Sequence, residues 1–257
     1  MSDGSILIRN EGAVRVLTID RPAKKNSLTG EMYVAINAAL DAASGDESVR
    51  AVLITGSERM FTAGNDLGDF LDHPPQGDEA PVIQLLYRLA AFAKPLIAAV
   101  DGPAVGIGTT LLLHTDDALA TTRAKFSLPF VNLGLVPEAG SSILLPQLAG
   151  LRRASRMLLC GEPFDAKTAL EAGLINEIVE PEQLQTAALA RAQIYASRPP
   201  QALLASKKLL RDPLREQVNA TIKLEAKQFA ERLQGPEAKS ALSAFVNKKR
   251  QGLQQEQ

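Results

Sequence analysis

The chain has 257 residues, with 28 Lys and Arg against 29 Asp and Glu, 46% hydrophobic residues, two His and one Cys. A chain of this length buries about three quarters of the surface that its unfolded form exposes, so it needs no disulfide or structural metal. The near-neutral charge argues against nucleic-acid binding, which depends on clustered Lys and Arg. We expect no metal site, and we expect Cys160 to be a small buried side chain.

The N-terminus holds a three-residue apolar run, which is too short for the apolar region of a secretory signal. The longest apolar tract, residues 95–108, is interrupted by Asp101 and is shorter than the ~20 residues that cross a bilayer. The last residues do not match a peroxisomal tripeptide. We therefore expect a cytoplasmic protein that does not bind membranes.

The first hundred residues alternate between strand and helix periods, which predicts an α/β protein. Strands are expected at residues 6–10 and 14–19, joined by a hairpin turn, and at 51–55 and 95–100. Helices are expected at residues 30–43, capped by Ser27 or Thr29, and at 82–93. Residues 69–80 are polar, contain two Pro and lack periodicity, so we expect a mobile loop over or beside a site.

Beyond residue 108 the pattern predicts a helical run at 109–114, short strands at 118–121 and 125–127, and a helix at about 140–148. Later helices are expected at 183–197, 201–210, 214–233 and 236–249. The Arg198-Pro199-Pro200 sequence interrupts this pattern. We therefore divide the chain into a core of residues 1–197 and a helical C-terminal region of residues 198–257.

Two Gly-containing segments are candidates for an oxyanion hole, a pair of N–H donors that stabilises developing negative charge. In FTAGNDL, residues 61–67, small side chains let the backbone approach a ligand, and AVGIGTT, residues 104–110, does the same where a helix begins. Each such donor contributes about 3 kcal/mol in a transition state. Taken singly, each segment is more simply explained as an ordinary tight turn.

A third segment, LGLVPEAGSS, residues 133–142, places Glu138 just before a predicted helix. An acidic residue at this point commonly only complements the helix dipole. The segment alone therefore favours a structural role for Glu138 over a catalytic one.

With three further motifs, these segments resemble the crotonase, or enoyl-CoA hydratase/isomerase, superfamily over essentially the whole chain. The others are RPAKKNSLT at 21–29, GEPFDAKTALEAGLINEIV at 161–179 and SAFVNKK at 243–249. The resemblance implies an α/β fold: a ClpP/crotonase-like superhelix of repeated ββα units with a helical C-terminal trimerisation region. It also implies a homotrimer or hexamer that acts on acyl-CoA thioesters, with coenzyme A as part of the substrate and no separate cofactor.

The resemblance assigns the enolate-stabilising N–H groups to Asn65 and Ile107. Because backbone N–H groups and not side chains stabilise the enolate, Asn65→Ala is expected to have almost no effect on activity. Lys24 or Lys25 lies where relatives meet phosphates, and Phe245 and Lys248 match a coenzyme A contact from a neighbouring subunit. The full implied substrate-binding set is Lys24, Lys25, Ala63, Gly64, Asp66, Gly106, Phe130, Leu135, Phe245 and Lys248.

Departures from the family pattern indicate which reaction is expected. Hydratases of the family carry two glutamates, and the matching positions here are Thr110 and Phe130, neither of which can activate water. Glu138 resembles the catalytic glutamate of the Δ3,Δ2-enoyl-CoA isomerases. With this resemblance, a catalytic role for Glu138 is favoured over a structural one. We expect an apolar wall of Phe130, Leu133 and Leu135 to raise the Glu138 pKa.

The leading hypothesis is therefore isomerisation of 3-enoyl-CoA to 2-enoyl-CoA in fatty acid β-oxidation, with Glu138, Asn65 and Ile107 as the catalytic groups. A second hypothesis is hydration or another crotonase reaction, such as dehalogenation or thioester hydrolysis. A third is a protein that binds coenzyme A esters without catalysis, or a relative recruited to RNA. The near-neutral charge argues against RNA, and the presence of Glu138 argues against loss of catalysis.

Overall fold

The computed structural model describes residues 4–75 and 77–244. A six-stranded sheet has the strand order β1-β2-β3-β4-β6-β9. The first two strands form an antiparallel hairpin, and every later neighbour in this sheet is parallel. The strands are β1 (Ser5–Glu11), β2 (Val14–Asp20), β3 (Ala51–Gly56), β4 (Leu96–Val100), β6 (Asp117–Thr121) and β9 (Glu177–Val179).

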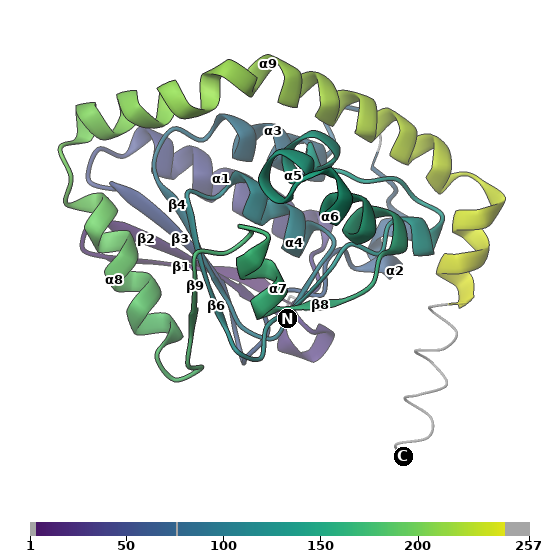
Figure 1. The fold of residues 1–257 in the computed structure, drawn as a ribbon, viewed down its shortest axis with the longest axis horizontal. Helices are drawn as coiled ribbons and strands as arrows, with labels where there is room; N and C mark the ends of the chain where they lie inside the picture. Colours follow the sequence, from purple (N-terminus) through teal and green to yellow (C-terminus); the bar gives the residue numbers. More distant parts are fainter. Residues whose placement is uncertain (1–3, 76, 245–257) are drawn as a thin grey trace.

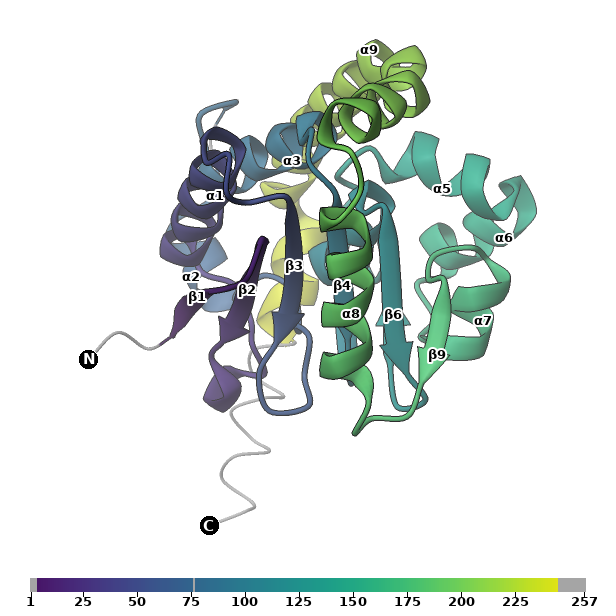
Figure 2. The same ribbon diagram turned by 90° about the vertical axis from the view of Figure 1, so that its left-hand side faces the viewer.

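Both faces of this sheet are covered by helices, as is usual for parallel sheets, and the inner strands β3 and β4 are accordingly buried along almost their whole length. Alternate residues such as Val16, Leu53 and Ile97 pack against α8 (Leu184–Ala196) on one face. Their neighbours, such as Leu17, Ile54 and Ala98, face the larger core with α1 (Gly30–Gly45) and α3 (Pro81–Ala91). Figure 2 shows α8 in front of the sheet and α1 behind it.

A smaller three-stranded sheet extends the structure beyond the ends of β3 and β4. It has the order β5-β7-β8, with β5 (Pro103–Val105), β7 (Lys125–Ser127) and β8 (Phe164–Asp165). The short helix α4 (Ile107–Thr110) and a 3-10 turn, η2 (Leu111–His114), follow β5 and lead back to β6. Because ligands of open α/β sheets bind at the carboxyl ends of the strands, this region is where a site is expected.

The C-terminal part of the chain is helical. It contains α5 (Ser141–Ala149), α6 (Leu151–Ser155), a π-helical turn η4 (Arg156–Cys160), α7 (Ala166–Glu171), α8 and the 34-residue α9 (Pro200–Leu233). Helix α9 crosses the whole molecule and contacts both α3 and α5 (Figure 1). A further helical segment covers residues 236–244. Residues 197–199 separate α8 from α9.

The structure corrects two expectations about secondary structure. Residues 69–72 belong to α2 (Leu67–Asp72), because the Asp66 carboxylate caps this helix by accepting hydrogen bonds from the N–H groups of Gly68 and Asp69. The two helices expected at 201–210 and 214–233 are one helix, α9, which passes through Pro213. Leu209, whose carbonyl loses its helical donor there, is 77% exposed, so water can supply the bond.

The single Cys is also placed differently from the expectation. Cys160 ends the π-helical turn and is exposed, whereas Met157 and Leu158 of the same turn are buried. The predicted hairpin is confirmed, with Glu11 paired to Val14 across the turn. None of the helices in the described part of the chain is long and apolar enough to cross a membrane.

Candidate active site

The two Gly-containing segments lie side by side where β3 and β4 end. Thr62 forms an isolated parallel bridge with Ala104, in which the Thr62 N–H donates to Pro103 O at 3.0 Å and the Val105 N–H donates to Thr62 O at 3.0 Å. Gly64 has a φ of +83°, and a Cβ there would lie 2.7 Å from Val105 O. Only glycine permits so close an approach of the two backbones.

The N–H groups of Asn65 and Ile107 are three residues beyond the bridged pair in each segment. Within the described residues, neither group donates a hydrogen bond to another protein group. Asn65 lies between Gly64 and Asp66, whose backbone groups bond to Leu28, and Ile107 begins α4. Two unpaired donors in the same register of adjacent segments are the arrangement that an oxyanion hole requires.

Glu138 is 6% exposed and lies on the wall of a cavity that Asn65 also lines. Its Oε1 accepts a hydrogen bond from Thr110 Oγ1 at 3.0 Å. Burial raises the pKa of Glu138 to about 7; the Thr110 hydrogen bond opposes this shift and the nearby charge of Glu225 adds to it. A carboxylate with this pKa is poised to take and return a proton near neutral pH.

The turn that carries Glu138 is held from two sides. Ala139 and Gly140 both have left-handed backbone, with φ of 63° and 69°. His114 Nε2 donates to Ala139 O at 2.7 Å, since a carbonyl can only accept, and burial lowers the His114 pKa to about 4. On the other side, Glu225 of α9 accepts from the Gly140 N–H at 2.6 Å. The position of the Glu138 carboxylate is therefore fixed by contacts from α4, η2 and α9.

Tyr33 of α1 binds the segment that carries Asn65 and lies near enough to Glu138 to be affected by its charge. Its hydroxyl donates a hydrogen bond to Asn65 Oδ1, and its side chain is 3% exposed. Burial, together with the negative charges of Glu138 and Asp69, raises the Tyr33 pKa well above its ordinary value. Tyr33 therefore remains a neutral donor. The expectation that Asn65→Ala has almost no effect on activity did not take this hydrogen bond to the Asn65 side chain into account.

The cavity beside Glu138 has a volume of about 540 Å³ and is mainly apolar. Its walls come from α2, α3, the segment between them and α9, and Phe70 packs edge-on against Phe229 across it. Phe130, Leu133 and Leu135 belong to the core rather than to this lining. The pKa of Glu138 is raised as expected, but burial of the carboxylate and Glu225 cause the shift.

The remaining predicted substrate-binding residues fall into four groups. Lys24 and Lys25 are exposed, and the Ala63 N–H donates to Lys25 O at 3.0 Å, so the basic loop adjoins the oxyanion segment. Gly106 leads into Ile107 and donates its N–H to Ser127 O. Asp66 is ion-paired to Arg21 at 2.6 Å and caps α2. Phe245 and Lys248 lie outside the described residues.

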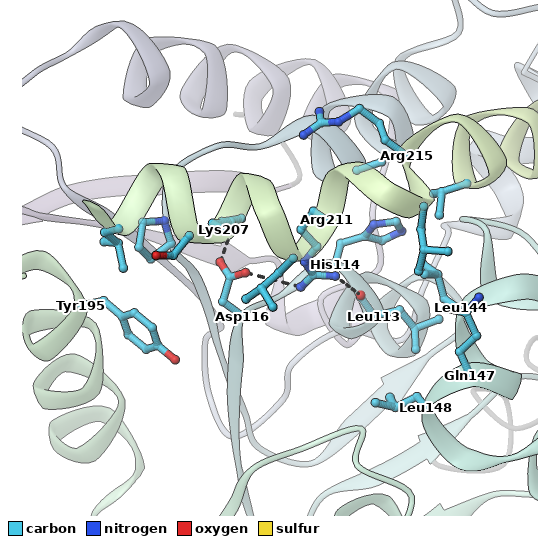
Figure 3. A pocket seen from close by; sticks show the side chains of 17 residues that line it. Leu113, His114, Asp116, Leu144, Gln147, Leu148, Tyr195, Lys207, Arg211 and Arg215 are labelled. Carbon is cyan, nitrogen blue, oxygen red and sulfur yellow. Dashed lines mark hydrogen bonds and ion pairs between the residues drawn. The ribbon is translucent and has the colours of Figure 1, made fainter. Parts of the chain in front are cut away.

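A second cavity, of about 510 Å³, lies beneath the N-terminal half of α9 (Figure 3). Lys207 and Arg211 face Asp116, with Lys207 Nζ 2.6 Å from its carboxylate, and Arg211 also donates to the carbonyls of Leu113 and Thr115. These cations are occupied in attaching α9 to the segment after η2. Neither Glu138 nor Asn65 lines this cavity, so we assign the site to the cavity beside Glu138.

Sequence reasoning did not identify Tyr33, His114 or Glu225 as parts of the site. For Glu225 the sequence does hold a signal. The residue interrupts the buried apolar stripe of α9 formed by Val218, Ile222 and Phe229, and a carboxylate in such a stripe requires buried donors. Tyr33 and His114 carry no such signal, because their partners are distant in sequence.

Comparisons with known proteins show the family to which the chain belongs. A family model described as Enoyl-CoA hydratase/isomerase matches residues 9–256. The chain is 36% identical to enoyl-CoA delta isomerase 2 of Rattus norvegicus over 95% of its own length, but it spans only 64% of that relative. It is 34% identical to the 2,3-dehydroadipyl-CoA hydratase of Escherichia coli K12, covering 95% of this chain and 96% of the relative.

Solved structures show the same fold. The enoyl-CoA hydratase/isomerase of Pseudoalteromonas atlantica T6c superposes with a TM-score of 0.90 at 40% identity, covering 95% of this chain and 97% of the other. OdaA of Pseudomonas aeruginosa superposes with a TM-score of 0.91 at 43% identity, covering 93% and 98%. The chain therefore has the crotonase fold and belongs to the enoyl-CoA hydratase/isomerase family, with isomerases among its similar relatives.

Proposed function

We propose that this protein converts 3-enoyl-CoA thioesters to 2-enoyl-CoA thioesters, with Glu138 as the single acid–base group. The proposal rests on one observation: the buried Glu138 carboxylate, with a pKa of about 7, shares a cavity with Asn65, and its hydrogen-bonding neighbour is the neutral Thr110. The relative named enoyl-CoA delta isomerase 2 supports the same assignment.

The reaction conserves atoms and needs no water. Glu138 takes a proton from C2, and the electrons of that C–H bond move into a dienolate whose negative charge lies on the thioester oxygen. The N–H groups of Asn65 and Ile107 stabilise this oxygen without reorganising, which contributes about 3 kcal/mol for each donor. Glu138 then returns the proton to C4, and the double bond lies between C2 and C3.

Hydration is the alternative, and relatives named hydratases make it a real competitor. Hydration needs a carboxylate pair to orient and activate water. Thr110 stands next to Glu138 at one of the two positions where hydratases carry glutamate, and Phe130 is packed in the core at the other. These two residues favour isomerisation over hydration.

The experiment supplies purified wild-type protein with 3-hexenoyl-CoA and, separately, with 2-hexenoyl-CoA, and follows both products by chromatography. We expect rapid formation of 2-hexenoyl-CoA from the first substrate and slow formation of 3-hydroxyhexanoyl-CoA from the second. Faster hydration than isomerisation would establish the hydratase alternative. Binding of both thioesters without turnover would establish a protein that binds coenzyme A esters without catalysis.

We further propose that the chain assembles as a homotrimer or hexamer, in which Phe245 and Lys248 complete a neighbour's coenzyme A site and Lys24 or Lys25 meets its phosphates. Light scattering should then report three or six chains. Removing residues 242–257 should weaken binding of coenzyme A thioesters more than binding of short pantetheine thioesters. An equal loss for both, or a monomer, would contradict this assembly.

A further inference from the structure

Glu225 is a second buried carboxylate beside the site, and it reaches the catalytic turn from a helix 87 positions further along the chain than Glu138. It is 6% exposed. It accepts three hydrogen bonds: from the Gly140 N–H at 2.6 Å, from the Ser142 N–H at 2.9 Å and from Ser142 Oγ at 2.5 Å. Among the described residues it has no basic partner, so these donors alone compensate its burial.

The backbone that Glu225 holds is in an unfavourable conformation. Ala139 has a φ of 63°, a region that L-residues with a Cβ rarely adopt, and Gly140 follows in the same region. Such a turn persists only where its surroundings determine it. His114 fixes the carbonyl of Ala139 and Glu225 fixes the N–H of Gly140, so the Ala139–Gly140 peptide is held at both its oxygen and its nitrogen by buried side chains.

The same contacts place a negative charge close to the base. Burial raises the pKa of Glu225, and the hydrogen bonds from Ser142 and Gly140 at the start of α5 oppose this shift because they favour the charged form of the carboxylate. The other groups around Glu138 are neutral: Thr110 from α4, and Tyr33 from α1, which faces both Glu138 and Asp69 of α2. In its ionised form, Glu225 from α9 is the charged group that acts on Glu138.

We propose that Glu225 is a positioning residue for the reaction: its carboxylate fixes the turn that carries Glu138, and its charge makes Glu138 a stronger base. This inference rests on the proposed role of Glu138. It also gives α9 a part in the reaction, because the helix that forms one wall of the substrate cavity holds the catalytic turn through the same segment.

The test measures kcat and KM for isomerisation of 3-hexenoyl-CoA from pH 5 to pH 9 with full-length Glu225→Gln. Glutamine removes the charge but keeps the volume. We expect the acid limb of kcat/KM to move down by about one pH unit, because the like charge that disfavours ionised Glu138 is gone. We expect kcat to fall about tenfold, and KM to stay within about twofold, because Glu225 does not line the cavity.

Glu225→Asp is the second variant, and Glu216→Gln, an exposed position on the same helix, is the control. Aspartate keeps the charge but is one methylene too short to reach all three donors. It should therefore lower kcat and leave the acid limb within about 0.3 pH units of the wild-type position. Glu216→Gln should match wild type in kcat, KM and the acid limb.

A Glu225→Gln protein with the wild-type acid limb overturns the electrostatic part of the proposal, even where kcat and thermal stability fall. A Glu225→Asp protein with full kcat overturns the positioning part of the proposal. This variant tests the positioning part even if Glu225→Gln does not fold. Failure of the proposed function appears separately, as a wild type that does not isomerise. In that case, the rate at which the C2 protons of butyryl-CoA exchange in D₂O is measured for the same variants in place of the isomerisation rate. This exchange needs only the base and the oxyanion donors.

Discussion

Thr110 donates a hydrogen bond to the carboxylate of Glu138, and the two oxygens are 3.0 Å apart in a fully buried environment. The pair consists of one titratable group and one neutral hydrogen-bond donor. Thr110 stabilises the charged form of Glu138 and so limits the effect of burial on its pKa. A base of intermediate strength is suited to both halves of a proton transfer that removes a proton from one carbon and returns it to another.

Removing the Thr110 hydroxyl should weaken this support. In Thr110→Val, which keeps the shape of the side chain, the pKa of Glu138 should rise further above about 7, because the hydrogen bond that lowers it is lost. The acid limb of kcat/KM should shift to higher pH, and activity at pH 6 should fall several-fold. Thr221→Val, on the surface of α9, is the control and should leave the profile unchanged. An unshifted limb in Thr110→Val would show that Thr110 does not support the base.

The wild-type pH profile itself is a prediction. Glu138 must be ionised to take a proton, so kcat/KM for 3-enoyl-CoA should rise with pH to a plateau, with its midpoint near pH 7. Stopped assays across pH 5 to 9 measure this directly. A midpoint near 4.5, the ordinary value for glutamate, would indicate a solvated carboxylate as the base and not Glu138 in its buried position.

The same pKa predicts how stability depends on pH. The pKa of Glu138 is raised in the folded protein from 4.5 to about 7, so the native state binds the proton more tightly than the unfolded chain does. Stability from this group is therefore full below pH 4.5 and is lost as pH rises through 7, a loss of about 3 kcal/mol. Glu138→Gln should be more stable than wild type by about this amount at pH 8 and equal to it at pH 4.5, as measured by urea unfolding. A constant difference across this range would contradict the buried, titrating carboxylate.

Tyr33 and Asn65 should act as one unit. Tyr33→Phe removes the donor to Asn65 Oδ1 and Asn65→Ala removes the acceptor, so each should loosen the segment that carries the Asn65 N–H. We expect each variant to lower kcat about tenfold with little change in KM, and the double variant to be no worse than either alone. Tyr195→Phe removes a comparable hydroxyl, which bonds to Asp117 away from the site, and should retain full kcat. Additive losses in the double variant would show that the two side chains act separately.

Much of the fold was predictable because the parallel strands are buried on both faces. Continuous apolar runs such as residues 51–55 and 95–100 identify β3 and β4 without any tertiary information. The secondary-structure predictions were wrong where a single local feature outweighed the general preference of the segment. Helix α2 forms in a polar segment where Asp66 caps it, and α9 continues through Pro213, where the residue whose carbonyl loses its donor, Leu209, is exposed.

The site divides in the same way. Asn65, Ile107 and Glu138 were assigned through the family resemblance, because each segment alone favoured a structural role, and the structure places Asn65 and Glu138 on one cavity. Glu225 and Tyr33 were not predictable, because the contact between Glu225 and Gly140 joins residues 85 positions apart and that between Tyr33 and Asn65 joins residues 32 apart. Such partners are determined by the packing of α9 and α1 against the core.

The most direct measurement is the rate at which full-length Glu138→Gln converts 3-hexenoyl-CoA to 2-hexenoyl-CoA under single-turnover conditions. Glutamine keeps the volume of the side chain and an oxygen that can accept the Thr110 hydrogen bond, so the protein should fold and bind the thioester as wild type does. The rate should fall by at least ~10³, since general base catalysis contributes about 10²–10⁴ and the other carboxylate among the described lining residues, Asp78, is exposed. A Glu138→Gln protein that isomerises at the wild-type rate would show that another group moves the proton and that Glu138 is not the base.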